Sequence, residues 1–239
     1  MRGGAAEVAL AAACACAAGA VAAQVPPLTP DGRTTGEGWH YAGLPRQKAP
    51  PTRFTPALID GVPAVRVDTQ RSYGNWVYRP APPMRVTALR WRWRVDQGNP
   101  QSNLREKSGD DMPLRVCLGF AVPLAQLPFM DRQLLRVAGA VASEALPTTT
   151  LCWVWDDKLP VGTVLPSPFT RRVRYVVTRG RGQAPGQWVD EERDVAADFK
   201  RAYGDEIDGL PLVDAVMIGG DSDNTLQQTS GAVAALDVR

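Results

Sequence analysis

The sequence predicts a mainly β fold, a β-sandwich with one or two accessory helices. Three observations lead to this expectation. Short apolar runs recur along most of the chain, and turns rich in glycine and proline separate them. Several of these runs alternate between apolar and polar residues, which is the period of a strand. Only two segments place apolar residues at helical spacing.

Nine segments are expected to form strands, with turn residues such as Gly61 and Gly74 between them. In chain order they are Phe54–Ile59, Pro63–Asp68, Asn75–Arg79, Val86–Val95, Leu114–Phe120, Thr150–Trp155, Arg172–Thr178, Val213–Ile218 and Val233–Val238. Short strands with regular turn signals are typical of a sandwich or a barrel.

The clearest strand is the run LRWRWRV at residues 89–95. A strand sends successive side chains to opposite faces, whereas a helix would mix them. One face therefore carries only apolar residues, and the other carries Arg90, Arg92 and Arg94. The runs 114–120 and 172–178 repeat the alternation, which puts Arg115 on the face opposite Leu114 and Val116.

Two helices are expected among these strands. The first covers Leu127 to Ala145, and Pro147 ends it. The second covers Asp194 to Tyr203, with Asp194 as its N-cap and Gly204 just beyond its end.

Residues 1–23 are predicted to be a secretory signal peptide. They combine a basic start, an apolar alanine-rich run and small residues before Gln24. A lipid anchor at Cys14 or Cys16 is an alternative that the short apolar run disfavours. Residues 24–38 are expected to be a flexible leader, and residues 39–239 a single β-sandwich domain. The mature chain would then lack a transmembrane segment and be periplasmic or extracellular.

Composition narrows the chemistry. The net charge of +2 argues against nucleic acid as the main partner. With His40 as the only histidine, the chain cannot build a zinc or iron site from two of its own histidines. After cleavage only Cys117 and Cys152 remain, both in strand-like runs. They are either a disulfide in an oxidising compartment or two buried thiols, and the sequence leaves both open.

Four segments, in this order, resemble one known family: LRWRWRV (89–95), SGDDMPLRVCLGF (108–120), TLCWVW (150–155) and MIGGDSDNT (217–225). The run from Glu192 to Val195 extends the likeness. The sequence resembles domain-of-unknown-function family 3047, a set of uncharacterised, mostly exported bacterial proteins, over roughly residues 39–238. This resemblance implies an envelope protein of unresolved activity and brings no catalytic residues. The chain is more distantly similar to jelly-roll carbohydrate-binding modules, which implies a jelly-roll-like sandwich.

The arginine face is the first candidate site. Guanidinium groups hold carboxylates and phosphates bidentately, so Arg90, Arg92 and Arg94, joined by Arg66 and Arg115, would suit an anionic glycan. The alternative is a solvated outer face, or arginines paired with the chain's own aspartates.

Two acidic clusters are the second candidate. Asp110 and Asp111 follow a glycine, and Asp221, Asp223 and Asn224 follow a glycine pair. Grouped oxygens suit calcium, with Asp221 and Asp223 as candidate ligands, although the complete twelve-residue calcium loop is missing. The alternative is turn chemistry, in which these side chains cap their own backbone. Apart from this calcium candidate, no cofactor is expected.

Aromatic residues are the third candidate. Trp91 and Trp93 are expected in the core, whereas Trp153 and Trp155 could stack on a sugar ring. His40, without an identifiable partner, is expected to be a polar edge residue.

Three hypotheses about function follow. The first is non-catalytic binding of a carbohydrate or anionic glycan through a sheet face that carries arginine and tryptophan. The second is a hydrolase of envelope glycans, which needs two carboxyls across one cleft, drawn from Asp110, Asp111, Glu192 and Asp223. The third is a structural, partner-binding envelope protein.

Overall fold

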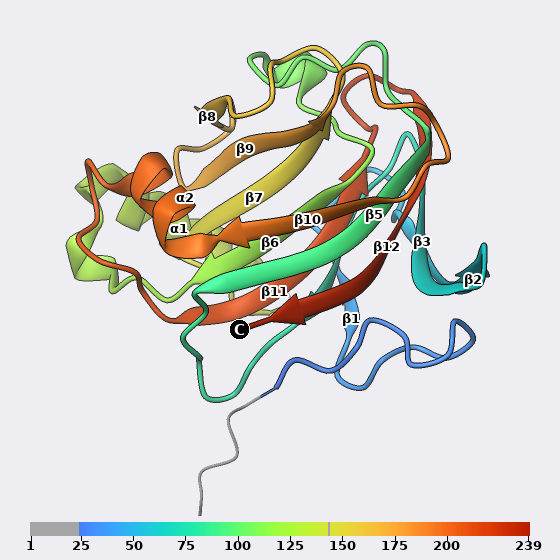
Figure 1. The fold of residues 1–239 in the computed structure, drawn as a ribbon. Helices are drawn as coiled ribbons and strands as arrows, with labels where there is room; N and C mark the ends of the chain where they lie inside the picture. The colour runs from blue at the N-terminus through green and yellow to red at the C-terminus, as the bar shows by residue number, and fades with distance from the viewer. Residues whose placement is uncertain (1–23, 143) are drawn as a thin grey trace, which may run out of the picture.

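The computed structural model describes residues 24–142 and 144–239, so the predicted signal peptide at residues 1–23 lies outside the described part. Two β-sheets pack face to face as a sandwich, with the two helices at one side and behind (Figure 1). The predicted mainly β sandwich with two helices is therefore confirmed. Its likeness to a jelly roll stays a prediction.

The seven-stranded sheet has, in spatial order, β1 (His40–Ala42), β4 (Tyr73–Tyr78), β11 (Val213–Asp221), β6 (Arg115–Phe120), β7 (Thr149–Asp156), β9 (Val173–Gly180) and β8 (Val164–Pro166). The five-stranded sheet has β10 (Val189–Asp194), β5 (Ala88–Gln97), β12 (Gln228–Val238), β3 (Val62–Gln70) and β2 (Arg53–Ile59). The β7–β9 pair is parallel, and the other strand pairs are antiparallel.

Tryptophans fill the space between the sheets. The alternation in β5 buries Trp91 and Trp93 against the facing β7, as the sequence predicts. Trp93 packs edge-on against Trp155, with ring centroids 5.5 Å apart, and Trp91 lies 6.0 Å from Trp153. Large aromatic surfaces removed from water make this cluster a main contributor to stability.

Helix α2 (Val195–Tyr203) confirms the second predicted helix. The Asp194 side chain accepts a hydrogen bond from the backbone N–H of Ala197 at 2.9 Å, which is the predicted N-cap. Phe199 packs on Phe120 of β6 at 4.6 Å, so α2 closes one end of the core. Helix α1 (Phe129–Val141) is shorter at both ends than predicted, because Pro128 precedes it and the backbone becomes extended at Ala142. Two short 3-10 helices, η1 (Lys107–Gly109) and η2 (Leu124–Gln126), lie in loops.

Residues 24–38 differ from the expected flexible leader. Val25 and Leu28 are buried in the core, and the Trp39 indole Nε1 donates to the Pro26 carbonyl at 3.0 Å. Apolar side chains among the prolines and glycines give this segment a surface to bury, which composition alone does not reveal. No helix within the described part of the chain is long and apolar enough to cross a bilayer.

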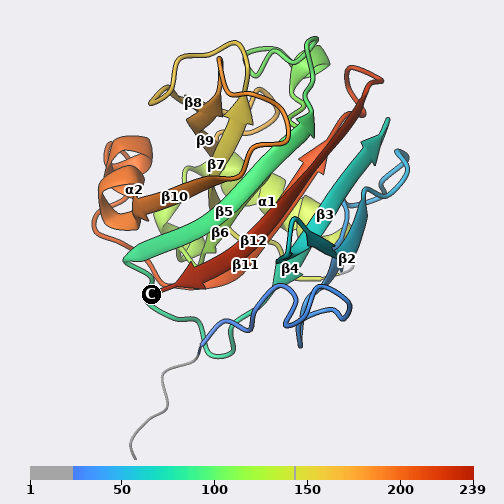
Figure 2. The ribbon, with the colours of Figure 1, turned by 45° about the vertical axis from the view of Figure 1, so that its right-hand side comes forward.

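The outer face of the seven-stranded sheet is covered rather than open to water. Cys117 on β6 and Cys152 on β7 are directly opposite each other and form a disulfide on this face. A second apolar cluster surrounds them, built from residues such as Met112, Val154 and Met217. Helix α1 lies on this side, behind both sheets in Figure 2.

Candidate functional site

A cleft with a volume of about 530 Å³ lies on the outer face of the seven-stranded sheet. Side chains of β4, β6, β7, β9 and β11 that point away from the sandwich core form its floor. Helix α1 and the loops that carry Asp110, Ser167 and Asp223 form its walls. One end of the cleft is polar and the other is apolar.

Arg115 organises the polar end of the cleft. Its Nη1 donates to Asp221 Oδ2 at 2.6 Å, its Nε to Asn75 Oδ1 at 3.1 Å and its Nη2 to the Gly74 carbonyl at 3.2 Å. A Cβ added to Gly219 would lie 2.8 Å from Arg115 Nε, so the glycine makes room for the guanidinium. Because each of its nitrogens has a partner and its charge is paired with Asp221, Arg115 holds the site together rather than offering a free cation.

Two of the aspartates anchor the surrounding loops. Asp221 accepts hydrogen bonds from Arg115 and from the backbone N–H of Met112. Burial raises the pKa of Asp221 to about 7, although the Arg115 charge opposes this rise. Asp111 accepts four hydrogen bonds from the backbone and side chains of Asn224 and Thr225. These bonds join two loops more than 110 residues apart in the sequence, so they differ from the local turn capping that the sequence left as an alternative.

Asp110 and Asp223 are different, because each has an oxygen without a partner. Asp110 Oδ2 accepts from Ser167 Oγ at 2.9 Å and from the Tyr175 hydroxyl at 3.1 Å. Asp110 Oδ1 and Asp223 Oδ1 are buried and accept no hydrogen bond from the described residues. Burial raises the pKa of Asp110 to about 6 and also raises the pKa of Asp223. A buried acceptor without a donor is costly, so both atoms are acceptors that a bound water or a ligand would stabilise.

Carboxylate oxygens of Asp111, Asp221 and Asp223 lie within 4.8 Å of one another. This is close enough for the calcium site considered from the sequence. The Arg115 guanidinium already places a positive charge against Asp221, and Asp111 is fully used by the neighbouring loop. Calcium binding at this cluster stays a prediction.

An ion-paired cluster stands at the rim of the cleft. Arg79 Nε donates to Glu144 Oε2 at 2.8 Å, and His40 Nε2 lies 3.1 Å from the same oxygen. Burial alone would raise the pKa of Glu144, but the bonds from Arg79 and His40 prevail and lower it. His40 is thus a partly exposed edge residue with a partner that no local sequence pattern reveals.

The predicted arginine face lies elsewhere. Arg90, Arg92 and Arg94 line the outer face of the five-stranded sheet, the opposite side of the sandwich from the cleft. Each pairs with a carboxylate of this sheet or of its hairpins, namely Glu192, Asp190, and Asp60 with Asp96. This matches the ion-paired alternative. Glu192 therefore lies on the opposite sheet from Asp110 and Asp223 and cannot share a cleft with them.

Trp153 and Trp155 lie between the sheets with the core tryptophans, and each is at most 2% exposed. The Trp153 indole donates to Asp198 Oδ2 at 2.7 Å. Because their rings face the core, neither presents a surface on which a sugar could stack. The sequence leaves this open because both faces of β7 are apolar, so its pattern does not tell the core side from the cleft side.

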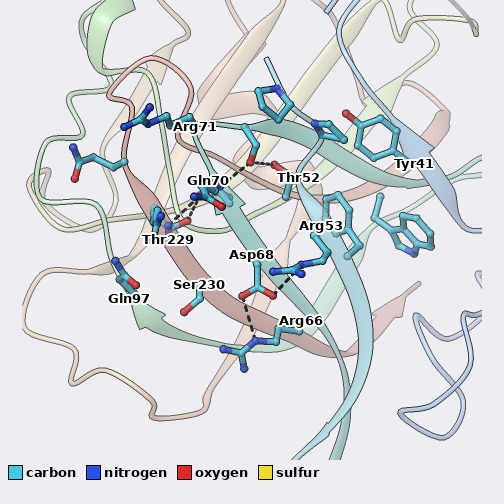
Figure 3. A pocket seen from close by; sticks show the side chains of 18 of the residues that line it. Tyr41, Thr52, Arg53, Arg66, Asp68, Gln70, Arg71, Gln97, Thr229 and Ser230 are labelled. Atoms are coloured by element: carbon cyan, nitrogen blue, oxygen red, sulfur yellow. Dashed lines mark hydrogen bonds and ion pairs between the residues drawn. The ribbon is translucent and has the colours of Figure 1, made fainter. Parts of the chain in front are cut away.

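A second hollow, more open and polar, lies beside β2 and β3 (Figure 3). Its volume is about 1360 Å³. In Figure 3 Asp68 sits between Arg53 and Arg66 and pairs with both. Thr69 and Thr229 likewise bond to each other at 2.8 Å. These polar groups satisfy one another, whereas the cleft on the other sheet keeps two carboxylate oxygens without donors.

The structure brings Asp110, Asp111, Arg115, Asp221, Asp223 and Asn224 together at the polar end of the cleft. Sequence reasoning missed Asn75, Ser167 and Tyr175, which hold Arg115 and Asp110 in place. The alternation of β9 could have indicated Tyr175, because a strand places this residue on the opposite face from Arg174 and Val176. Asn75 and Ser167 stand in no pattern that marks them.

Comparison with known proteins gives a family but no activity. No curated protein matches the chain. A family model described as a protein of unknown function (DUF3047) matches residues 37–236. This range covers the cleft, all of the candidate residues and both sheets apart from the last two residues of β12. The chain therefore belongs to the DUF3047 family, as the four quoted segments predict.

Proposed function

We propose that this protein binds a carbohydrate in the cleft of the seven-stranded sheet, with Asp110 and Asp223 in direct contact with it. The observation that carries the proposal is the pair of buried carboxylate oxygens without donors at one end of one cleft. Sugar hydroxyls are donors of the required kind, and a charged acceptor makes such bonds stronger. A cleft of this volume falls within the usual range for small-ligand sites.

The charges at the polar end favour one class of sugar. Arg115 is engaged by its own partners, so the groups that remain for a ligand are carboxylates. These repel an anionic glycan and accept hydrogen bonds from neutral or amino sugars. The proposal therefore places neutral and amino sugars ahead of anionic ones.

Binding to a panel of neutral, amino and acidic oligosaccharides, measured by titration calorimetry, tests the proposal. Asp110→Asn and Asp223→Asn should each weaken binding at least tenfold, because a neutral amide is a weaker acceptor than a carboxylate. Arg92→Ala, on the opposite sheet, is the matched control and should leave the Kd unchanged. No saturable binding, or equal loss in all three variants, would overturn the proposal.

Hydrolysis of the bound glycan is the second candidate function. Asp110 supports it, because a carboxyl whose pKa is raised to about 6 is about half protonated at pH 6, where the protonated fraction can act as a general acid. Asp223 would be the second carboxyl that a glycosidase requires. Reducing ends released at pH 6 from an oligosaccharide that binds, and lost in Asp110→Asn, would establish hydrolysis. A bound oligosaccharide that stays intact would leave binding alone.

We further propose that the protein acts in the periplasm or outside the cell. The disulfide between Cys117 and Cys152 supports this, because such bonds persist in oxidising compartments. Fusing residues 1–23 to a reporter that is active only after export tests the proposed signal peptide, and a reporter that remains inactive would contradict it.

A further inference from the structure

The second half of the cleft is lined mainly by apolar side chains. Its floor is the Cys117–Cys152 disulfide with Met217 and Val173, all on the outer face of the sheet. Leu134, Leu135, Ala138 and Ala142 face this floor from α1 and its C-terminal end. The space between them continues into the polar end, so one ligand can occupy both halves.

Helix α1 gains little burial from its own protein. None of its residues is buried, and Leu134 remains 56% exposed. Helices in folded proteins obtain most of their stability from packing an apolar side. An apolar group that lies between α1 and the sheet would supply this missing burial, whereas a sugar alone would not.

The two ends of the cleft therefore require different chemistry from one ligand. Asp110 and Asp223 at the polar end disfavour an anion and accept from a hydroxyl or an ammonium group. The disulfide and the side chains that α1 turns toward it offer mainly apolar surface at the other end, although Thr150, Thr170 and Arg172 also line the cleft. Building on the proposed function, we propose that the ligand is an amphiphile, with a neutral or cationic hydroxylated head at Asp110 and Asp223 and an aliphatic chain beneath α1.

The subsite proposed for the aliphatic chain of the ligand can be tested without knowing the ligand's head group. N-phenyl-1-naphthylamine fluoresces in apolar surroundings and serves as the probe. It should bind the full protein saturably, and decanol should displace it. Decylamine and decanol should displace the probe at concentrations at least tenfold lower than decanoate at pH 8, because the carboxylates at the polar end repel the anionic head. Equal displacement by all three, or no saturable probe binding, would overturn the inference.

Two alanines of the same helix give a matched pair of variants. Ala138→Trp fills the space beneath α1 and should weaken probe binding at least tenfold. Ala140→Trp adds the same side chain at an exposed position outside the cleft lining, and the Kd should change less than twofold. Equal behaviour of the two variants would place the probe on the outer surface of α1 and contradict the inference.

The outcome separates this inference from the proposed function. Sugar binding without probe binding would reject the chain subsite and leave carbohydrate binding in place. Probe binding blocked by Ala138→Trp, with no binding to any glycan of the panel, would keep the apolar subsite and reject the carbohydrate head.

Discussion

Replacing Asp110 with asparagine should make the ligand-free protein more stable while it weakens ligand binding at least tenfold. Asp110 is 5% exposed, and burial raises its pKa from 3.8 to about 6. This shift corresponds to an upper limit of about 3 kcal/mol for keeping the carboxyl ionised in the folded protein. An amide accepts more weakly from Ser167 and Tyr175, so we expect a net gain of about 1–2 kcal/mol in the free energy of unfolding.

The sign of the effect depends on pH. The folded protein binds the Asp110 proton more tightly than the unfolded chain, so the wild type loses stability as the pH rises from about 4 through 6. Asp110→Asn has no such loss. Its advantage should therefore be small at pH 4 and complete at pH 8, where a gain of about 1–2 kcal/mol raises the Tm by about 3–6 °C.

Thermal and urea unfolding at pH 4 and pH 8 measure this difference. Asp190→Asn is the control, because Asp190 is an exposed carboxyl that pairs with Arg92, and its replacement should change stability by less than about 1 kcal/mol at either pH. A less stable Asp110→Asn at pH 8, or an equal shift at both pH values, would refute the assignment of Asp110 as an uncompensated buried carboxyl.

Three further predictions concern the frame of the cleft and the opposite sheet. Arg115→Met should lower the free energy of unfolding by about 3–5 kcal/mol, because it leaves the Asp221 charge buried alone, and adding Asp221→Asn should restore part of it; additive losses in urea unfolding would contradict this coupling. Replacing Cys117 and Cys152 with alanine should cost about 2–4 kcal/mol and make stability insensitive to a thiol reductant, whereas a wild type unaffected by reductant would argue against the bridge. Arg92→Ala should lower the free energy of unfolding by less than about 1 kcal/mol and leave glycan binding unchanged. A loss of glycan binding in this variant would place the site on the five-stranded sheet and contradict the proposal.

Local pattern predicted the layers of this fold. The alternation in β5 identified the core tryptophans because a strand fixes which side chains share a face. The Asp194 cap of α2 was predicted because it depends only on residues three positions apart. The short edge strands β1 and β8 have three residues each, too few for a periodic signal, and β10 carries five charged residues in six, so none of these three was predicted.

The site was harder to predict, because distant segments create it. Arg92 and Arg115 occupy equivalent outward positions in alternating strands, yet one is paired on an open face and the other is enclosed in a cleft. The difference comes from which loops fold over each sheet. Arg115 and Asp221 are 106 positions apart in the sequence, and Asp110 and Tyr175 are 65 apart. Local periodicity carries no information at these distances, so the acidic residues could be proposed but not their grouping.

A crystal structure with the best-binding glycan of the panel tests the central claim most directly. The account predicts sugar oxygen or nitrogen atoms within about 3.2 Å of Asp110 Oδ1 and Asp223 Oδ1, at the polar end of the cleft on the seven-stranded sheet. A glycan on the arginine face of the five-stranded sheet, or in the hollow of Figure 3, would contradict it.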